Sequence, residues 1–189
     1  RLYASERDKP LVLDDIDAAN NLVELFLKRA DEKGDQPFLG AKRQGTWQTI
    51  SWREAAERVC LLAENLRGLG LEDGDRVGLV SENRPEFCIA DLAIMAAGCV
   101  TVPTYTTNTT RDHQHILTDS GARAVIVSTA KLAQALMPAV IRSQAAFVIG
   151  MEPLRGAQGS CACHLWRDLI AAHAHDPAAD VDIVAAAQR

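Results

Sequence analysis

The stretch RVGLVSENRPEFCIADLAIMAAGCVTVP (76–103) decides the fold, because it holds a strand, a helix and a second strand in direct succession. Residues 76–80 form a short apolar run, typical of a strand that is buried on both faces. The segment 83–86 opens a helix that continues to about Gly98. The apolar residues after this glycine predict the next strand, which we expect Pro103 to end, since proline has no N–H to donate to a neighbouring strand.

The same alternation continues downstream. A helix that stops near Gly121, a strand at 124–128, a helix capped by Ser128 or Thr129, and a last strand at 147–150 follow in order. Short apolar strands that alternate with helices are typical of a mostly parallel sheet covered by helices on both faces. The sequence therefore predicts the α/β class.

A helix and a hairpin precede this alternating region. Apolar residues at helical spacing predict a helix from Asn20 to Gly34. Two short strands at 37–43 and 46–50 follow. The Gln-Gly pair at 44–45 joins them, because glycine supplies the positive φ that a tight turn requires.

The next helix has a marked start and end. Ser51 and Glu54 have the spacing of a capping box, in which each side chain satisfies a backbone N–H of the first turn. Gly68 and Gly70 end the helix. A phosphate-binding loop would follow a strand and open a helix, whereas these glycines precede a strand. We therefore expect a helix terminus there, and the chain contains no GxxxxGK[ST] motif.

The chain divides by pattern into three parts. Residues 1–50 hold an N-terminal arm, the first helix and the hairpin, and residues 51–150 hold the α/β core. Beyond Gly150 the alternation stops, and the glycine and proline content predicts a loop. A short helix at 166–173 and a linker towards a downstream domain complete the third part, 151–189.

Composition limits the function classes. The 189 residues include 25 acidic and 20 basic side chains, and the net charge of −5 argues against a nucleic-acid partner. The five cysteines are an odd number and indicate a reducing cytoplasm. The opening residues contain no apolar signal region, and the longest apolar stretch, 92–102, is too short to span a bilayer. We expect a cytoplasmic protein and leave open a peripheral contact with a membrane.

Two groups of metal-ligand residue types occur, and neither predicts a metal site. Cys161, Cys163 and His164 lack the second pair of ligands that a structural zinc needs, so a loop with incidental thiols is favoured. His113 and His115 lie two apart on a predicted helix and therefore point to different faces. We expect no metal ligands and no catalytic side chain in this chain.

The polar loop 103–112 has two interpretations. It follows a strand at its carboxyl end and carries Tyr105 and several threonines, which offer hydroxyl groups and one aromatic face. The loop could serve only to connect the strand to the next helix and to cap that helix. It could also form the edge of a ligand site, since parallel sheets bind ligands beyond the carboxyl ends of their strands.

Two runs of sequence resemble a known family. The run LAIMAAGCVTVPTYTTNTTRDHQHILTDSGARAVIVS (92–128) resembles a core motif of the adenylate-forming acyl-CoA synthetase and ligase superfamily, and the run 50–87 resembles the motif before it. The combination of SENRPEF with VPTYTT is most similar to the long-chain fatty-acid–CoA ligase branch. The resemblance extends over residues 20–150, and residues 151–189 match only loosely.

The resemblance implies a partial N-terminal subdomain of the adenylate-forming fold. The intact enzyme would use ATP, Mg²⁺ and coenzyme A to convert a fatty acid to acyl-CoA through an acyl-adenylate, with release of pyrophosphate and AMP. Its phosphate-gripping loop and its catalytic lysine belong to later motifs, which this sequence lacks. The implied partners are downstream domains of the same chain, the fatty acid and coenzyme A, and we expect the segment alone to be inactive and to bind none of these cofactors tightly.

The resemblance also implies one binding edge. Residues that match the loop and strand end near the coenzyme A nucleotide of related enzymes are Tyr105, Thr106, Thr107, Thr129 and Lys131. An ordinary solvated lysine remains the alternative for Lys131. Two other classes also stay open for the whole chain: a stand-alone α/β ligand-binding module and a dimerising module without catalysis.

Overall fold

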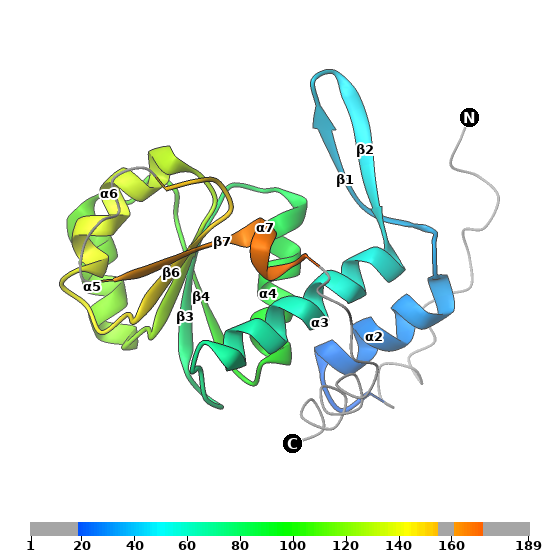
Figure 1. Ribbon diagram of the computed structural model, residues 1–189, viewed down its shortest axis with the longest axis horizontal. Coiled ribbons are helices and arrows are strands. Elements are labelled where there is room, and N and C mark those ends of the chain that lie inside the picture. The colour runs from blue at the N-terminus through cyan, green and yellow to red at the C-terminus, as the bar shows by residue number, and fades with distance from the viewer. Residues whose placement is uncertain (1–18, 155–160, 172–189) are drawn as a thin grey trace.

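A five-stranded parallel sheet forms the body of the protein (Figure 1). The computed structural model describes residues 19–154 and 161–171. The spatial order of the strands is β4-β3-β5-β6-β7. Their bounds are β3 (Arg76–Val80), β4 (Val100–Thr104), β5 (Ala124–Val127), β6 (Phe147–Gly150) and β7 (Ala162–Leu165).

Helices cover both faces of this sheet, as the sequence predicted. Helices α3 (Trp52–Gly68) and α4 (Pro85–Ala96) pack on one face, and α5 (Thr110–Ser120) and α6 (Ala130–Val140) pack on the other (Figure 1). Side chains of a strand alternate between the faces. Leu79 and Ile126 accordingly belong to the core under α3 and α4, whereas Val80 and Val125 belong to the core under α5 and α6.

Strand β4 is longer than the sequence predicted. It continues through Pro103, which lies opposite Leu79 of β3, and ends at Thr104. The expectation that Pro103 ends the strand was therefore wrong. The physical reason is the position of β4 at one edge of the described sheet, where one side of its backbone has no partner strand. Proline is tolerated on edge strands for this reason.

Strand β7 corrects a second expectation. The sequence predicted that the strand at 147–150 was the last and that 151–165 formed a loop, yet Ala162–Leu165 pairs in parallel with β6. The four residues Ala-Cys-His-Leu carry no β-branched side chain, so the pattern gives little strand signal, and pairing with β6 supplies the conformation. Helix α7 (Trp166–Leu169) follows and is shorter than predicted. Residues 155–160 and 172–189, which include the predicted linker, lie outside the described residues.

The first helix and the hairpin match their predictions, whereas residues 1–18 of the predicted N-terminal arm lie outside the described residues. Helix α2 (Leu22–Lys33) ends at Gly34, and strands β1 (Pro37–Arg43) and β2 (Thr46–Ser51) form the antiparallel hairpin. An aromatic cluster joins the base of the hairpin to α2 and α3: the ring of Phe38 stacks on Trp52 at 3.8 Å, and Phe26 lies 6.0 Å from Trp52. The hairpin tip projects beyond the helices (Figure 1).

The helix caps differ in one detail from the prediction. The Ser51 hydroxyl accepts a hydrogen bond from the Glu54 N–H, as expected. The Glu54 carboxylate, however, accepts from the Arg58 guanidinium rather than closing the capping box. A complete capping box occurs instead between Thr109 and Asp112 at the start of α5.

The C-terminal end of α3 lies where the sequence predicted it. Helix α3 ends at Gly68, and Gly70 adopts a φ of 95°, which confirms a helix terminus and a turn at the two glycines. Among the described residues, no helix combines the length and the apolar character that a bilayer crossing would require. The division of the chain into the parts 1–50, 51–150 and 151–189 stays a prediction.

Candidate functional site

The candidate site lies at the carboxyl edge of the parallel sheet. All five strands run in the same direction, so their carboxyl ends meet at one edge. Ligands of open α/β sheets bind beyond this edge. Strand β3 leads there into the loop 81–84, β4 into the loop 105–109, β5 into Ser128 and Thr129, and β6 into Glu152.

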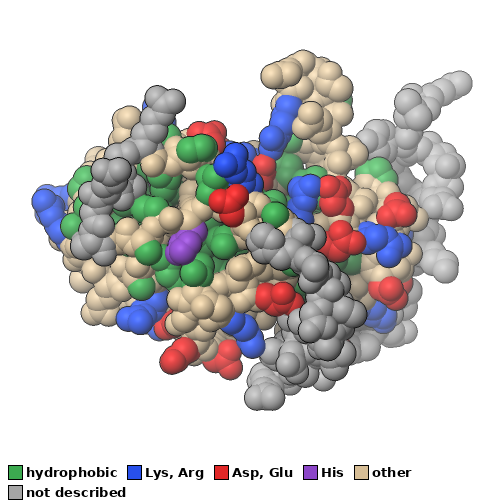
Figure 2. All heavy atoms as spheres, in the orientation of Figure 1, with side chains coloured by type: hydrophobic (Ala, Val, Ile, Leu, Met, Phe, Trp, Pro, Cys, Tyr) green, Lys and Arg blue, Asp and Glu red, His purple; other side chains and the backbone are tan. Residues whose placement is uncertain are grey.

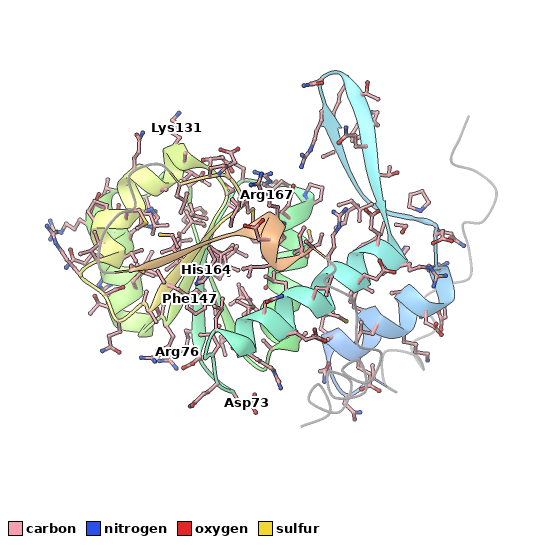
Figure 3. All side chains as sticks on the ribbon, in the orientation of Figure 1. Asp73, Arg76, Lys131, Phe147, His164 and Arg167 are labelled. Carbon is pink, nitrogen blue, oxygen red and sulfur yellow. The ribbon has the colours of Figure 1, made fainter. Side chains whose placement is uncertain are left out.

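The structure places the five predicted residues at this edge in two groups. Tyr105, Thr106 and Thr107 follow β4, and the Tyr105 side chain is 80% exposed. Thr129 and Lys131 follow β5, and Lys131 lies exposed in the first turn of α6 (Figure 3). Strand β3 separates the two groups, so they flank the loop that follows β3. Their part in coenzyme A binding stays a prediction.

The structure decides which residue caps α6. The Thr129 hydroxyl accepts a hydrogen bond from the Leu132 N–H at 3.2 Å, so Thr129 is the cap. Ser128 is completely buried, and its hydroxyl donates a hydrogen bond to the Glu82 carboxylate. The loops after β3 and β5 are therefore joined by a side-chain hydrogen bond.

Glu82 is a member of the site that the sequence analysis missed. The hydrogen bond from Ser128 lowers the pKa of its carboxyl group, and the positive charges of Arg84 and Lys131 contribute in the same direction. The signal available in the sequence was position, since Glu82 and Ser128 each lie just after an apolar strand of the alternating unit, and such residues fall at the carboxyl edge of a parallel sheet.

Arg84 and Glu86 form an ion pair beside this loop. Two guanidinium nitrogens of Arg84 donate to the Glu86 carboxylate at 2.9 and 3.1 Å, and Arg43 of the hairpin donates to the same carboxylate at 2.5 Å. Burial alone would raise the pKa of Glu86. The hydrogen bonds and the positive charge of Arg84, the hydrogen bond from the backbone N–H of Glu86 itself and the hydrogen bond from Arg43 together outweigh burial and hold the pKa at about 2. Glu86 thus connects the start of α4 to the tip region of the hairpin.

Glu152 brings a second carboxylate to the edge. Its carboxylate accepts a hydrogen bond from the Ala130 N–H at 3.4 Å, at the start of α6, and its charge helps to raise the pKa of Arg84. The edge therefore carries Glu82 and Glu152 together with Arg84 and Lys131. Figure 2 shows acidic and basic side chains interspersed over the visible face, without a field of one sign. Such an edge can contact a polar ligand with both charges.

The histidines and cysteines that the sequence analysis considered as metal ligands do not join this site. His113 is buried and His115 is exposed on α5, so they point apart as predicted. Cys163 and His164 lie in β7 rather than in the predicted loop, and the His164 ring meets Phe147 edge-on at 5.7 Å (Figure 3). Within residues 19–154 and 161–171, no three His, Cys, Asp or Glu side chains are grouped so that they could hold a metal ion.

Comparison with known proteins agrees with the fold and identifies the family. A family model described as AMP-binding enzyme matches residues 26–179. The long-chain-fatty-acid–CoA ligase FadD15 of Mycobacterium tuberculosis is 37% identical over 100 residues, which are 52% of this chain and 17% of that protein. The long-chain-fatty-acid–CoA ligase of Yersinia pestis is 33% identical over 144 residues, which are 75% of this chain and 24% of that protein. Each match thus covers less than a quarter of the length of the relative.

Two solved structures show the same fold. A benzoate CoA ligase from Burkholderia xenovorans LB400 superposes with a TM-score of 0.66 and 26% identity, over 82% of this chain and 30% of that chain. The adenylation domain of a carboxylate reductase from Mycobacterium chelonae superposes with a TM-score of 0.70 over 81% of this chain and 29% of that chain, at 19% identity. The second likeness concerns the fold alone.

Proposed function

The chain belongs to the AMP-binding enzyme family and corresponds to an N-terminal part of an acyl-CoA synthetase, and we propose that this enzyme is a long-chain fatty-acid–CoA ligase. The observation that carries the proposal is the family match over residues 26–179, together with ligase relatives at 33% and 37% identity. The five cysteines of the sequence are an odd number, which supports a cytoplasmic location as part of the proposal.

The proposed reaction has two steps. The fatty carboxylate attacks the α-phosphate of ATP, which forms the acyl-adenylate and releases pyrophosphate; the thiol of coenzyme A then attacks the acyl carbon and releases AMP. Mg²⁺ would stabilise negative charge on the phosphates. The described residues do not group into a metal-ligand set, so we assign no Mg²⁺ ligand to this part of the chain. We propose that the segment alone is inactive.

The role proposed for this chain is to form one wall of the coenzyme A site. Lys131 is exposed at the carboxyl edge and offers a positive charge to a phosphate of the nucleotide. Tyr105 is 80% exposed and offers an aromatic face on which an adenine can stack. The hydroxyl groups of Thr106 and Thr107 lie beside it in the sequence. The hydrogen bond between Ser128 and Glu82 holds together the loops that these residues flank.

The 189-residue chain is expected to show no measurable binding of Mg·ATP by isothermal titration calorimetry. Its sequence holds no glycine-rich loop that ends in lysine, so no cradle of backbone N–H groups is available for the phosphates. Micromolar binding of Mg·ATP to this chain would contradict the proposed assignment of the nucleotide site to later motifs.

Coenzyme A is expected to bind weakly, and Lys131→Ala is expected to weaken that binding about fivefold, as for the loss of one partly screened charge pair. Dephospho-coenzyme A lacks the 3′-phosphate and so carries less negative charge for Lys131 to attract. Lys131→Ala should therefore weaken the binding of dephospho-coenzyme A less than that of coenzyme A. NMR titration with both ligands measures the effect. Lys33→Ala, at the exposed end of α2, is the matched control. Equal losses for the two lysine variants would show that Lys131 is an ordinary solvated lysine.

A further inference from the structure

The outward face of the β1–β2 hairpin is a surface that neither the fold nor the proposed reaction uses. Leu39 pairs with Ile50, and both pack against the core, so this face of the hairpin is turned towards the body. Because side chains alternate along a strand, residues 40 and 42 of β1 and 47 and 49 of β2 lie on the opposite face. That face is turned away from the protein.

Trp47 dominates this outward face. It is 70% exposed, and it has the largest side chain among the exposed large hydrophobic residues of the described part of the chain. Lys42 lies directly opposite Trp47 in the strand register, is exposed, and makes no ion pair within the part of the chain that the structure describes. Gly40 has no side chain to cover the ring, and the position of its missing Cβ is 3.8 Å from Trp47 Cε3.

The charge of the hairpin is opposite to that of the chain. Residues 36–52 contain Lys42 and Arg43 and no aspartate or glutamate, whereas the chain as a whole carries a net charge of −5. Arg43 is paired with Glu86, so Lys42 is the cation that this segment presents on the outward face. The hairpin tip projects beyond the helices (Figure 1), so it can approach a flat surface before the acidic parts of the molecule do. This arrangement is complementary to a negatively charged surface.

We propose that this face of the hairpin docks on an anionic lipid surface, with the Trp47 ring in the headgroup region and Lys42 against the lipid phosphates. Tryptophan next to a cationic side chain is the combination that membrane interfaces favour. A protein partner fits the face less well. The neighbours of Trp47 are glycine, threonine and glutamine, and this narrow strip is small beside the roughly 800 Å² per partner of a stable protein interface.

Vesicle binding tests the proposal independently of the ligase reaction. The chain is mixed with vesicles of phosphatidylcholine plus phosphatidylglycerol or of phosphatidylcholine alone, and binding is measured by co-sedimentation. Binding is expected to the anionic vesicles only and is expected to weaken with salt. Lipids brominated near the headgroup should quench the tryptophan fluorescence, because Trp47 is exposed whereas Trp166 is buried and Trp52 is stacked on Phe38.

Two variants and a control decide the result. Trp47→Ala should lower the partition coefficient about tenfold, and Lys42→Ala about fivefold. Ile141→Ala removes an apolar side chain that is 54% exposed at the end of α6 and should leave binding unchanged. No binding by the unmodified chain, or unchanged binding of Trp47→Ala, overturns the proposal. A dimer in analytical ultracentrifugation that Trp47→Ala abolishes also overturns it, in favour of a second copy as the occupant.

Discussion

Replacing Ile126 by alanine is expected to lower the free energy of unfolding by about 3 kcal/mol. Ile126 has no exposed surface and lies in β5, with strand neighbours on both sides. It lies opposite Leu79 of β3 and Ile149 of β6, and all three belong to the core beneath α3 and α4. The substitution removes three carbon atoms, and close packing prevents its neighbours from filling the space.

Urea denaturation of the 189-residue chain, followed by circular dichroism, measures this loss. Ile141→Ala is the matched control, because it makes the same chemical change at a side chain that is 54% exposed, and its expected cost is below about 0.5 kcal/mol. A loss below about 1 kcal/mol at Ile126 would mean that β5 is not the packed centre of the sheet.

The sequence was sufficient to predict the strands of the sheet centre. Residues 76–80, 124–127 and 147–150 are apolar at nearly every position because helices cover both faces of β3, β5 and β6. A strand buried in this way gives a continuous apolar run, and the glycines and caps that bound it are local signals. The fold class could therefore be predicted without knowledge of strand order.

The edges of the sheet were less predictable, since tertiary position decides them. Pro103 is compatible with β4 only because this strand has one unpaired side, and nothing near residue 103 in the sequence specifies an edge. Strand β7 has only four residues and half-exposed or exposed side chains, so neither apolar content nor alternation identifies it. Its conformation depends on hydrogen bonds to β6.

The sequence could predict where the residues of the candidate site lie, but not which side chains they contact. The positions of Tyr105 and Lys131 at the carboxyl edge follow from strand–helix alternation. The hydrogen bond between Ser128 and Glu82 joins residues 46 apart, and it requires β3 and β5 to be neighbours. Alternation does not determine strand order, so this contact could not be predicted from the sequence. The same holds for the contact between Arg43 and Glu86, because the angle of the hairpin is set by tertiary packing.

Replacing Glu86 by glutamine is expected to lower the free energy of unfolding by about 2 kcal/mol at neutral pH. The Glu86 side chain is only 14% exposed and binds two guanidinium groups, those of Arg84 and Arg43. Glutamine preserves the shape but removes the charge, which leaves Arg84, itself 22% exposed, without the carboxylate to which it donates two hydrogen bonds. The expected loss lies between those of exposed and of fully buried ion pairs, because the Arg43 side chain is 49% exposed.

The pH dependence gives this prediction a second readout. The pKa of Glu86 is lowered from 4.5 to about 2 in the folded protein. A lowered carboxyl pKa contributes stability that is fully present above the ordinary pKa and is lost as the pH falls towards the folded-state value. The unmodified chain should therefore lose stability between about pH 4.5 and pH 2 through this group, and Glu86→Gln should show a shallower slope, by up to about 1.4 kcal/mol per pH unit.

Urea titrations at a series of pH values separate this ion pair from ordinary surface charges. Glu54→Gln is the matched control, because Glu54 pairs with Arg58 on the partly exposed face of α3, where such pairs contribute less than about 1 kcal/mol. Since Glu86 connects α4 to the hairpin, its loss should also increase amide hydrogen exchange in β1 and β2 while exchange in β5 changes only with global stability. If Glu86→Gln and Glu54→Gln give the same loss and the same slope, the two arginines do not hold the hairpin through Glu86.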